Sequence, residues 1–188
     1  SSDAAAALRV LAGLSGRTLP TAPDCAGLGA DVPVCLSPRP RRMRGIGEDL
    51  SAPLALPAAW LVLVNPRVEV STPAVYRAFD ALGEFGDVAP PPMPAAFESV
   101  EELAAWLGMM RNDLQVPAVG LAPAVGDVLA TLSEERETLI ARMSGSGATC
   151  FAICASDIEA DALAARVDAL RPDWWTVRCR LGGPWPDA

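Results

Sequence analysis

Residues 60–64 (WLVLV) carry the strongest strand signal in the chain and constrain the fold more than any other segment. The run is rich in residues that favour strands, and Asn65-Pro66 ends it. Downstream, the patterns predict helices from residue 72, over 99–110 and over 113–132, strands over 138–143 and 149–154, a helix over 156–170 and a strand over 174–180. This split β-α-β order predicts an α+β, ferredoxin-like domain: an antiparallel sheet with helices packed on one face.

Local signals mark where several of these helices begin and end. Thr72 is expected to cap a helix that opens with a proline. Ser99 and Ser156 each stand three residues before a glutamate, which is the spacing of a capping box. Pro117 and Pro123 predict breaks in the helical segment that contains them.

The first part of the chain carries shorter and weaker signals. The elements expected there are a helix over 3–14 with leucines 8, 11 and 14 on its buried face, a short apolar strand over 32–36, and weak strands over 41–46 and 50–56. Ser2 is the expected N-cap of the first helix. We therefore expect a partial domain over residues 1–57 and a second domain over residues 58–188. Because the chain opens directly on a helix start, we also expect a further segment before Ser1.

The composition excludes several kinds of chemistry within these 188 residues. There is no His, and no Lys occurs along the sequence, so all 15 basic residues are Arg. The chain therefore supplies no Ser-His-Asp triad, no Walker lysine and no Schiff base. Proton abstraction must fall to a carboxylate, a cysteine or Tyr76, the single tyrosine.

Charge and hydropathy restrict the expected partners. Asp and Glu number 23 and the formal net charge is −8, whereas a nucleic-acid binder needs a basic surface. The longest apolar run, residues 54–64, contains Pro57 and is far shorter than the ~20 residues that span a bilayer. Five cysteines without a CxxC pair favour reduced thiols in a cytoplasmic protein. We expect neither nucleic acid nor a membrane as a partner.

Several residues could bind or react, although each also has an ordinary structural interpretation. Ser1 and Ser2 could bind an anion at a helix start, or they could only cap the helix. Asp31 stands beside glycines and before an apolar run, where it could accept a substrate proton or bond its own turn. Tyr76 could stack on a base, or it could lie in the core.

Two further segments could bind anions. Residues 144–149 (SGSGAT) form a glycine-rich loop whose N–H groups, at Gly145, Ser146 and Gly147, could cradle a phosphate. The loop joins two predicted strands, so it is neither a Walker loop nor a Rossmann turn, and a plain hairpin loop is the alternative. Four arginines between residues 39 and 44 could attract an anion or lie in a solvated loop.

Together and in this order, these features resemble the GHMP small-molecule kinases. The matching stretches are residues 1–6 (SSDAAA), 28–34 (LGADVPV), 43–48 (MRGIGE), 65–76 (NPRVEVSTPAVY), 112–114 (NDL) and 142–149 (RMSGSGAT). The resemblance implies a GHMP kinase-like fold. Residues 1–57 would be the remnant of its N-terminal, ribosomal protein S5 domain 2-like, ATP-binding domain. Residues 58–188 would be its ferredoxin-like C-terminal domain.

The resemblance also implies roles for single residues. They are Asp31 as the catalytic general base, Ser1, Ser2, Gly145, Ser146 and Gly147 as ATP-binding residues, and Thr72 and Tyr76 as substrate-binding residues, with the tyrosine stacked on a cytosine. The implied reaction is ATP-dependent phosphorylation of the 2-hydroxyl of 4-diphosphocytidyl-2-C-methyl-D-erythritol in non-mevalonate isoprenoid biosynthesis. Mg²⁺ would be held mainly by phosphate oxygens and water, so no metal ligand is assigned to this chain.

Other interpretations stay open. In the family, a glycine-rich loop, a catalytic lysine and a Tyr-His pair precede the Ser-Ser stretch, so this chain alone is expected to be inactive. One alternative is another GHMP kinase, acting on mevalonate, homoserine or a sugar. The other is a non-catalytic ferredoxin-like binding module. The oligomeric state is expected to be a monomer or a homodimer.

Overall fold

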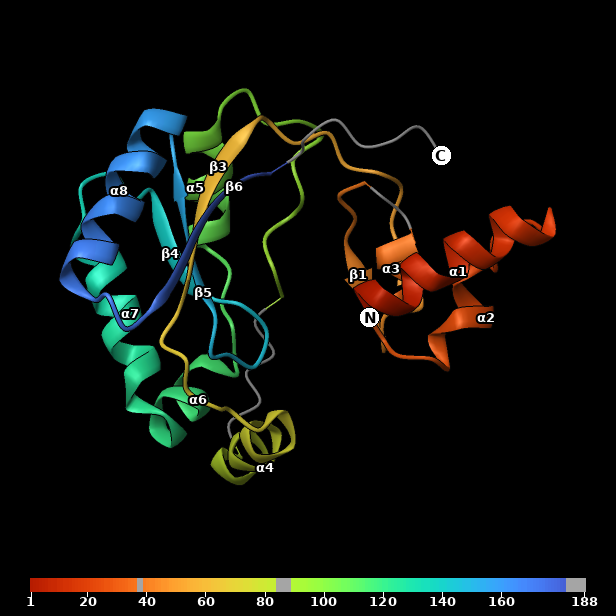
Figure 1. Ribbon diagram of the computed structural model, residues 1–188, viewed down its shortest axis with the longest axis horizontal. Helices are drawn as coiled ribbons and strands as arrows, with labels where there is room; N and C mark the ends of the chain where they lie inside the picture. The colour runs from red at the N-terminus through yellow and green to blue at the C-terminus, as the bar shows by residue number, and fades with distance from the viewer. Residues whose placement is uncertain (37–38, 84–88, 182–188) are drawn as a thin grey trace. The chain divides into compact units, whose positions relative to one another are not determined.

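The computed structural model describes residues 1–36, 39–83 and 89–181. Within them the chain forms two compact units, Ser1–Leu56 and Pro57–Leu181 (Figure 1). The boundary falls where the prolines of the preceding segment give way to the first long strand. The assignment of the two units to the two domains of a kinase stays a prediction.

A four-stranded antiparallel sheet forms the centre of the second unit. Its strands are β3 (Ala59–Asn65), β4 (Ile140–Met143), β5 (Cys150–Cys154) and β6 (Trp175–Leu181), in the order β4-β5-β3-β6. β3 is paired on both edges, so that Val62 stands opposite Ala152 on one side and Arg178 on the other. The predicted split β-α-β order and the ferredoxin-like fold are confirmed.

Five helices accompany this sheet in the described residues. They are α4 (Thr72–Leu82), α5 (Val100–Gly108), α6 (Gln115–Leu121), α7 (Pro123–Glu134) and α8 (Asp157–Leu170). The hydroxyl oxygens of Ser99 and Ser156 accept from the N–H groups three residues later, as the capping boxes predict. The chain breaks before Pro123, whereas Pro117 lies in the first turn of α6, where its missing N–H is not needed.

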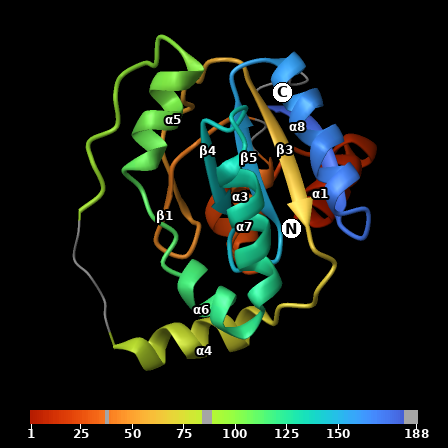
Figure 2. The same ribbon diagram turned by 90° about the vertical axis from the view of Figure 1, so that its left-hand side faces the viewer.

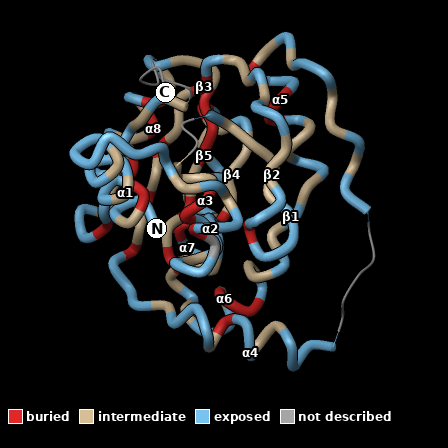
Figure 3. The backbone as a smooth tube through the Cα atoms, turned by 90° about the vertical axis from the view of Figure 1, so that its right-hand side faces the viewer, coloured by how far each residue is buried: buried red, intermediate tan, exposed pale blue. Residues whose placement is uncertain are grey.

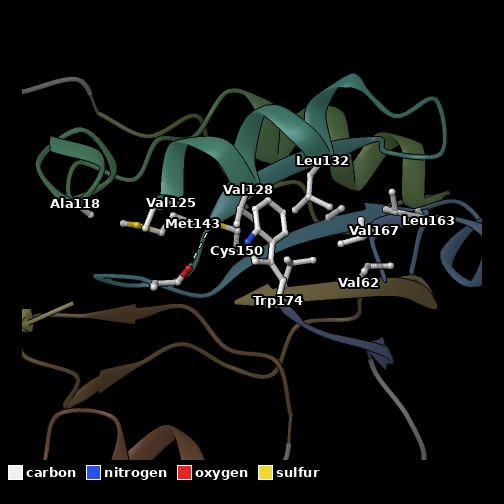
Figure 4. Close-up of a cluster of buried hydrophobic side chains, with 14 of the residues drawn as sticks. Val62, Ala118, Val125, Val128, Leu132, Met143, Cys150, Leu163, Val167 and Trp174 are labelled. Atoms are coloured by element: carbon white, nitrogen blue, oxygen red, sulfur yellow. Dashed lines mark hydrogen bonds between the residues drawn. The ribbon is translucent and has the colours of Figure 1, made fainter. Parts of the chain in front are cut away.

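The main core lies between one face of the sheet and helices α7 and α8. Figure 2 shows these two helices in front of the strands, and Figure 3 shows the buried positions along β3 and β5. The fully buried side chains include Val64 and Ala152, together with several that Figure 4 labels: Val62, Cys150, Val125, Val128, Leu132, Leu163 and Val167. Burial of such apolar surface stabilises the unit by about 25 cal/mol per Å².

The opposite face of the sheet is covered in part by α5, so the prediction that helices pack on one face only is wrong. Ala59, Val100 and Ile153 form a second buried cluster there, with Leu61 and Phe151 against it. The physical reason is that β3 has apolar side chains on both of its faces. A strand of this kind needs cover on both sides.

The first unit differs more from the sequence prediction. Its elements are α1 (Ser2–Ser15), α2 (Ala22–Ala26), α3 (Val32–Leu36), β1 (Met43–Arg44) and β2 (Asp49–Leu50). The two strands are shorter than predicted and pair antiparallel across the turn between them. Leu11 and Leu14 of α1 are 61% and 82% exposed, so the predicted buried leucine face is wrong (Figure 3).

Residues 32–36 form a helix and not the predicted strand. The N–H of Cys35 donates to the Asp31 carbonyl over 3.1 Å, which closes a helical turn. Pro33 occupies the first turn, where a missing N–H costs no hydrogen bond. A run of five apolar residues fits either element, because its periodicity is too short to separate them.

One partly buried ion-pair cluster links α8 to the segment after α7. The two terminal nitrogens of Arg166 each lie 2.9 Å from a Glu137 carboxylate oxygen, and Arg166 also binds Glu135. Glu137 is only 5% exposed. The hydrogen bonds from Arg166 lower the pKa of Glu137 from its usual 4.5 to about 2, against the opposing effect of burial.

We expect the free energy of unfolding to fall as the pH is lowered from 4.5 towards about 2, because the unfolded chain binds the Glu137 proton first. Glu137→Gln should destabilise the protein at neutral pH and weaken this acid dependence. Urea unfolding at several pH values measures both effects. The exposed Glu134→Gln variant is the control, and an unchanged pH profile in Glu137→Gln would contradict the assignment.

Candidate functional site

The glycine-rich loop between β4 and β5 is a tight connection held by its own backbone. Ser144 N–H donates to Thr149 O over 2.9 Å, and Gly147 N–H donates to Ser144 O over 3.0 Å. Gly145 and Gly147 have φ values of 54° and 90°, which side chains disfavour. A Cβ on Gly147 would lie 3.0 Å from the Met143 sulfur. Both glycines are therefore required by the loop conformation.

Two hydroxyl groups of this loop form hydrogen bonds with side chains from other parts of the same unit. The Thr72 and Ser146 hydroxyl oxygens are 2.7 Å apart, which joins the start of α4 to the loop. Asn65, at the end of β3, donates from Nδ2 to the Thr149 hydroxyl over 2.9 Å. The structure thus brings together two residues predicted for different ligands, Thr72 and Ser146.

Asn112 makes the most extensive contact with the loop. Its Nδ2 donates to Met143 O over 3.0 Å and to Gly145 O over 2.8 Å. Its Oδ1 accepts the N–H of Leu114 over 3.0 Å. No role for Asn112 is predicted from the sequence, although the residue stands in a motif of the resemblance. The available local signal is the capacity of an asparagine to bond the backbone two residues on.

Helix α4 places Thr72 and Tyr76 on one side. Ser71 is the N-cap and Thr72 is the first helical residue, so the prediction that Thr72 caps the helix is wrong by one position. Its hydroxyl is therefore available for Ser146. Tyr76 follows one turn later, in the spacing that places two side chains next to each other, and it is 51% exposed. An exposed ring in this position is open to stacking.

In the first unit, the structure brings the other predicted residues together. Ser1 is the N-cap of α1, not Ser2, and both serines are exposed. A Cβ on Gly29 would lie 3.9 Å from the Ser1 hydroxyl oxygen, and the Ser2 hydroxyl oxygen lies 3.8 Å from the Cys35 sulfur of α3. Asp31 is exposed directly before α3. The segment that contains Asp31 thus packs against the N-terminus of the 14-residue helix α1.

A second turn packs against the Asp31 segment. A Cβ on Gly47 would lie only 2.0 Å from the Ala30 carbonyl oxygen, and Gly47 has φ 100°. Glu48 fixes the same turn, because its carboxylate accepts the Ile46 N–H over 2.7 Å. The Gly-Ile-Gly-Glu stretch therefore positions the backbone next to Asp31.

The arginine cluster and the cysteines are weaker candidates for binding or reaction than the two groups above. Arg41 donates to Ser51 O over 2.6 Å, so part of its charge fixes a turn. All five cysteines are free. Burial raises the pKa of the Cys150 thiol to about 12 and that of Cys154 to about 11, so neither is a thiolate at neutral pH.

The described ranges offer neither a metal-binding cluster nor a helix that could span a membrane. No group of three or more His, Cys, Asp or Glu side chains there could hold a metal ion. No helix in the same ranges has the length and apolar character needed to cross a bilayer.

We expect Gly47→Ala to displace the Ala30–Asp31 backbone, because a Cβ cannot fit 2.0 Å from a carbonyl oxygen. Amide hydrogen exchange over residues 29–36 should become faster in this variant. Gly27→Ala is the control, since a Cβ there meets nothing within 4 Å. Equal exchange rates in the two variants would contradict the close approach.

Comparison with known proteins relates this arrangement to one family. Residues 93–172 match the family described as GHMP kinases C terminal. The chain is 57% identical to the 4-diphosphocytidyl-2-C-methyl-D-erythritol kinase of Caulobacter sp. (strain K31), over 98% of this chain and 64% of that protein. It is 50% identical to the protein of the same name from Cereibacter sphaeroides (strain ATCC 17025 / ATH 2.4.3), over 97% of this chain and 65% of that protein.

A solved structure agrees with these matches. The crystal structure of a 4-(cytidine 5'-diphospho)-2C-methyl-D-erythritol kinase has a TM-score of 0.68 and 32% identity, over 96% of this chain and 64% of that chain. The chain thus spans a little less than two thirds of the length of the curated relatives it matches. From these matches along nearly its whole length, the chain is similar to GHMP kinases, and its residues 93–172 match the C-terminal part of that family.

Proposed function

We propose that the whole protein to which this chain contributes transfers the γ-phosphoryl group of ATP to the 2-hydroxyl of 4-diphosphocytidyl-2-C-methyl-D-erythritol. The observation that carries the proposal is the 57% identity, along 98% of the chain, to a relative named for that kinase. The resemblance of residues 28–34 and 142–149 to kinase motifs supports it. Neither alternative, another GHMP kinase or a non-catalytic module, is favoured by these matches.

In this proposal Asp31 of the first unit is the base, and Ser1 and Ser2 contact the ATP phosphates. The Asp31 carboxylate takes the proton of the 2-hydroxyl while the hydroxyl oxygen bonds to the γ-phosphorus and ADP leaves. Ser1 and Ser2 stand at the N-terminus of α1, where unpaired N–H groups and the helix dipole favour phosphate.

Further binding roles are proposed for residues of the second unit. Tyr76 would stack its exposed ring on the cytosine, with Thr72 one turn away. Gly145, Ser146 and Gly147 would direct loop N–H groups to the ATP phosphates. Mg²⁺ would be bound mainly by phosphate oxygens and water when ATP enters.

The test is an activity assay on a completed protein, in which the chain is joined to the part of the Caulobacter relative that it does not match. We expect ADP release with 4-diphosphocytidyl-2-C-methyl-D-erythritol and none with mevalonate, homoserine or galactose. The chain alone is assayed in parallel and is expected to be inactive. No turnover by the completed protein, or turnover with another acceptor, would overturn the proposal.

We predict that Asp31→Asn in the completed protein lowers kcat by about 10²–10⁴-fold, the usual contribution of a general base. The amide keeps the shape of the side chain but cannot take the proton. Circular dichroism should show an unchanged fold. The matched control is Asp49→Asn, another exposed carboxylate of the first unit. An equal kcat in the two variants would remove Asp31 from the mechanism.

We predict that Tyr76→Ala weakens binding of the cytidyl substrate by about 1–3 kcal/mol, the usual worth of one base stacked on an aromatic ring. ATP binding should be nearly unchanged, because the ring is assigned to the cytosine. Tyr76→Phe keeps the ring and should restore substrate binding. Calorimetric titration of each ligand measures the two affinities. An equal loss for both ligands would count against stacking.

The expectations on location, oligomeric state and nucleic-acid binding go beyond what the matches to known proteins address. A cytoplasmic location and a monomeric or homodimeric state stay predictions for this protein. Absence of nucleic-acid binding likewise rests on the net charge of −8 alone.

A further inference from the structure

We propose that Asn112 is a positioning residue that directs the Ser146 N–H of the glycine loop towards a bound phosphate. This inference rests on the proposed kinase function and goes beyond it by assigning a task to a residue that does not itself touch a ligand. It starts from the two hydrogen bonds by which Asn112 Nδ2 holds the carbonyl oxygens of Met143 and Gly145.

The planar peptide bond links this contact to the N–H that follows. In a trans peptide the C=O of one residue and the N–H of the next point in opposite directions. Because Asn112 holds Gly145 O over 2.8 Å, it turns the Ser146 N–H away from itself. In the described part of the chain no acceptor is recorded for that N–H. It is therefore a donor with a fixed direction and a free hydrogen-bonding capacity.

A second peptide, between Met143 and Ser144, is fixed in the same way. Asn112 holds Met143 O over 3.0 Å, and the next N–H, that of Ser144, donates to Thr149 O. This second bond closes the base of the loop. One side chain thus fixes two peptide planes, one at the base of the loop and one at its outer part.

Asparagine suits this position because its amide uses three of its hydrogen-bonding sites here. Both hydrogens of Nδ2 have carbonyl acceptors, and Oδ1 accepts the Leu114 N–H. The bond to Leu114 is local and holds the amide in one orientation. Aspartate has the same shape, but when ionised it has no donor and would place negative charge against two carbonyl oxygens.

A purely structural role is the rival interpretation, since Asn112 also ties the segment before α6 to β4. Gln115 provides a matched contact for comparison, because its Oε1 accepts the Met143 N–H over 3.3 Å. Gln115 therefore joins the same helix region to the same strand end without contacting Gly145. The change Gln115→Glu keeps this acceptor and adds the same charge as Asn112→Asp.

The test compares Asn112→Asp with Gln115→Glu in the completed protein. We expect Asn112→Asp to lower kcat at least tenfold while KM for the cytidyl substrate changes less than twofold, because the loop donor acts on the phosphates. Gln115→Glu should stay within twofold of the unaltered protein in both constants. Amide hydrogen exchange over residues 143–149 should become faster in Asn112→Asp only.

The outcomes separate the two proposals. If the unaltered completed protein has no kinase activity, the proposed function fails and this inference fails with it. If that protein is active but Asn112→Asp keeps its kcat, or both variants lose it equally, Asn112 has no positioning role and the proposed function stands. If Asn112→Asp does not fold, Asn112→Ser keeps one hydroxyl donor without added charge. It should show the same split with a smaller loss, and an unchanged kcat there would overturn the inference.

Discussion

Strand β3 must form hydrogen bonds along both of its edges and bury side chains on both of its faces, and the second unit is arranged around this requirement. Its partners β5 and β6 satisfy the backbone groups on the two edges. On one face Val62 and Val64 pack under α7 and α8, and on the other Ala59 joins the cluster under α5. An unpaired buried backbone group costs about as much as a lost hydrogen bond, so this central strand requires both neighbours.

The same strand brings the loop and α4 together. Val64 pairs with Cys150, so the end of β3 lies beside the beginning of β5. Asn65 then donates to Thr149, and the chain continues from β3 into the helix that carries Thr72. The contact between Thr72 and Ser146, which are 74 residues apart in sequence, follows from strand register. Register in a sheet with two apolar faces is strongly specified, because a slip would change every packing contact.

The elements from residue 59 to residue 181 could be predicted from the sequence because their signals are local. Capping serines, strand-forming runs and prolines act within a few residues of where they stand. The two errors of architecture have different causes. The helix over residues 32–36 was missed because five apolar residues carry too little periodicity. The position of α5 was missed although the unbroken apolar run of residues 60–64 indicated cover on both faces.

Only those residues of the candidate site that stand in recognisable motifs could be predicted from the sequence. Asp31, Tyr76 and the glycine loop stand in recognisable stretches, and their roles stay predictions. The contacts of Asn112 could not be predicted, because its loop partners lie 31 and 33 residues away and depend on the finished sheet. Hydrogen bonds that cross such distances are set by tertiary packing, which a local pattern does not record.

A loop without charged side chains needs hydrogen bonds from other segments to hold its backbone in one orientation. Residues 144–149 contain no charged side chain, so any attraction to a phosphate must come from N–H dipoles and hydroxyls. A hydrogen bond weakens steeply as its angle departs from linearity, whereas an ammonium charge attracts from any direction. Dipoles that are already oriented also avoid reorganisation when charge develops. The side chains of Asn65, Thr72 and Asn112, from three separate segments of the chain, hold this loop without adding a charge that would compete for the anion.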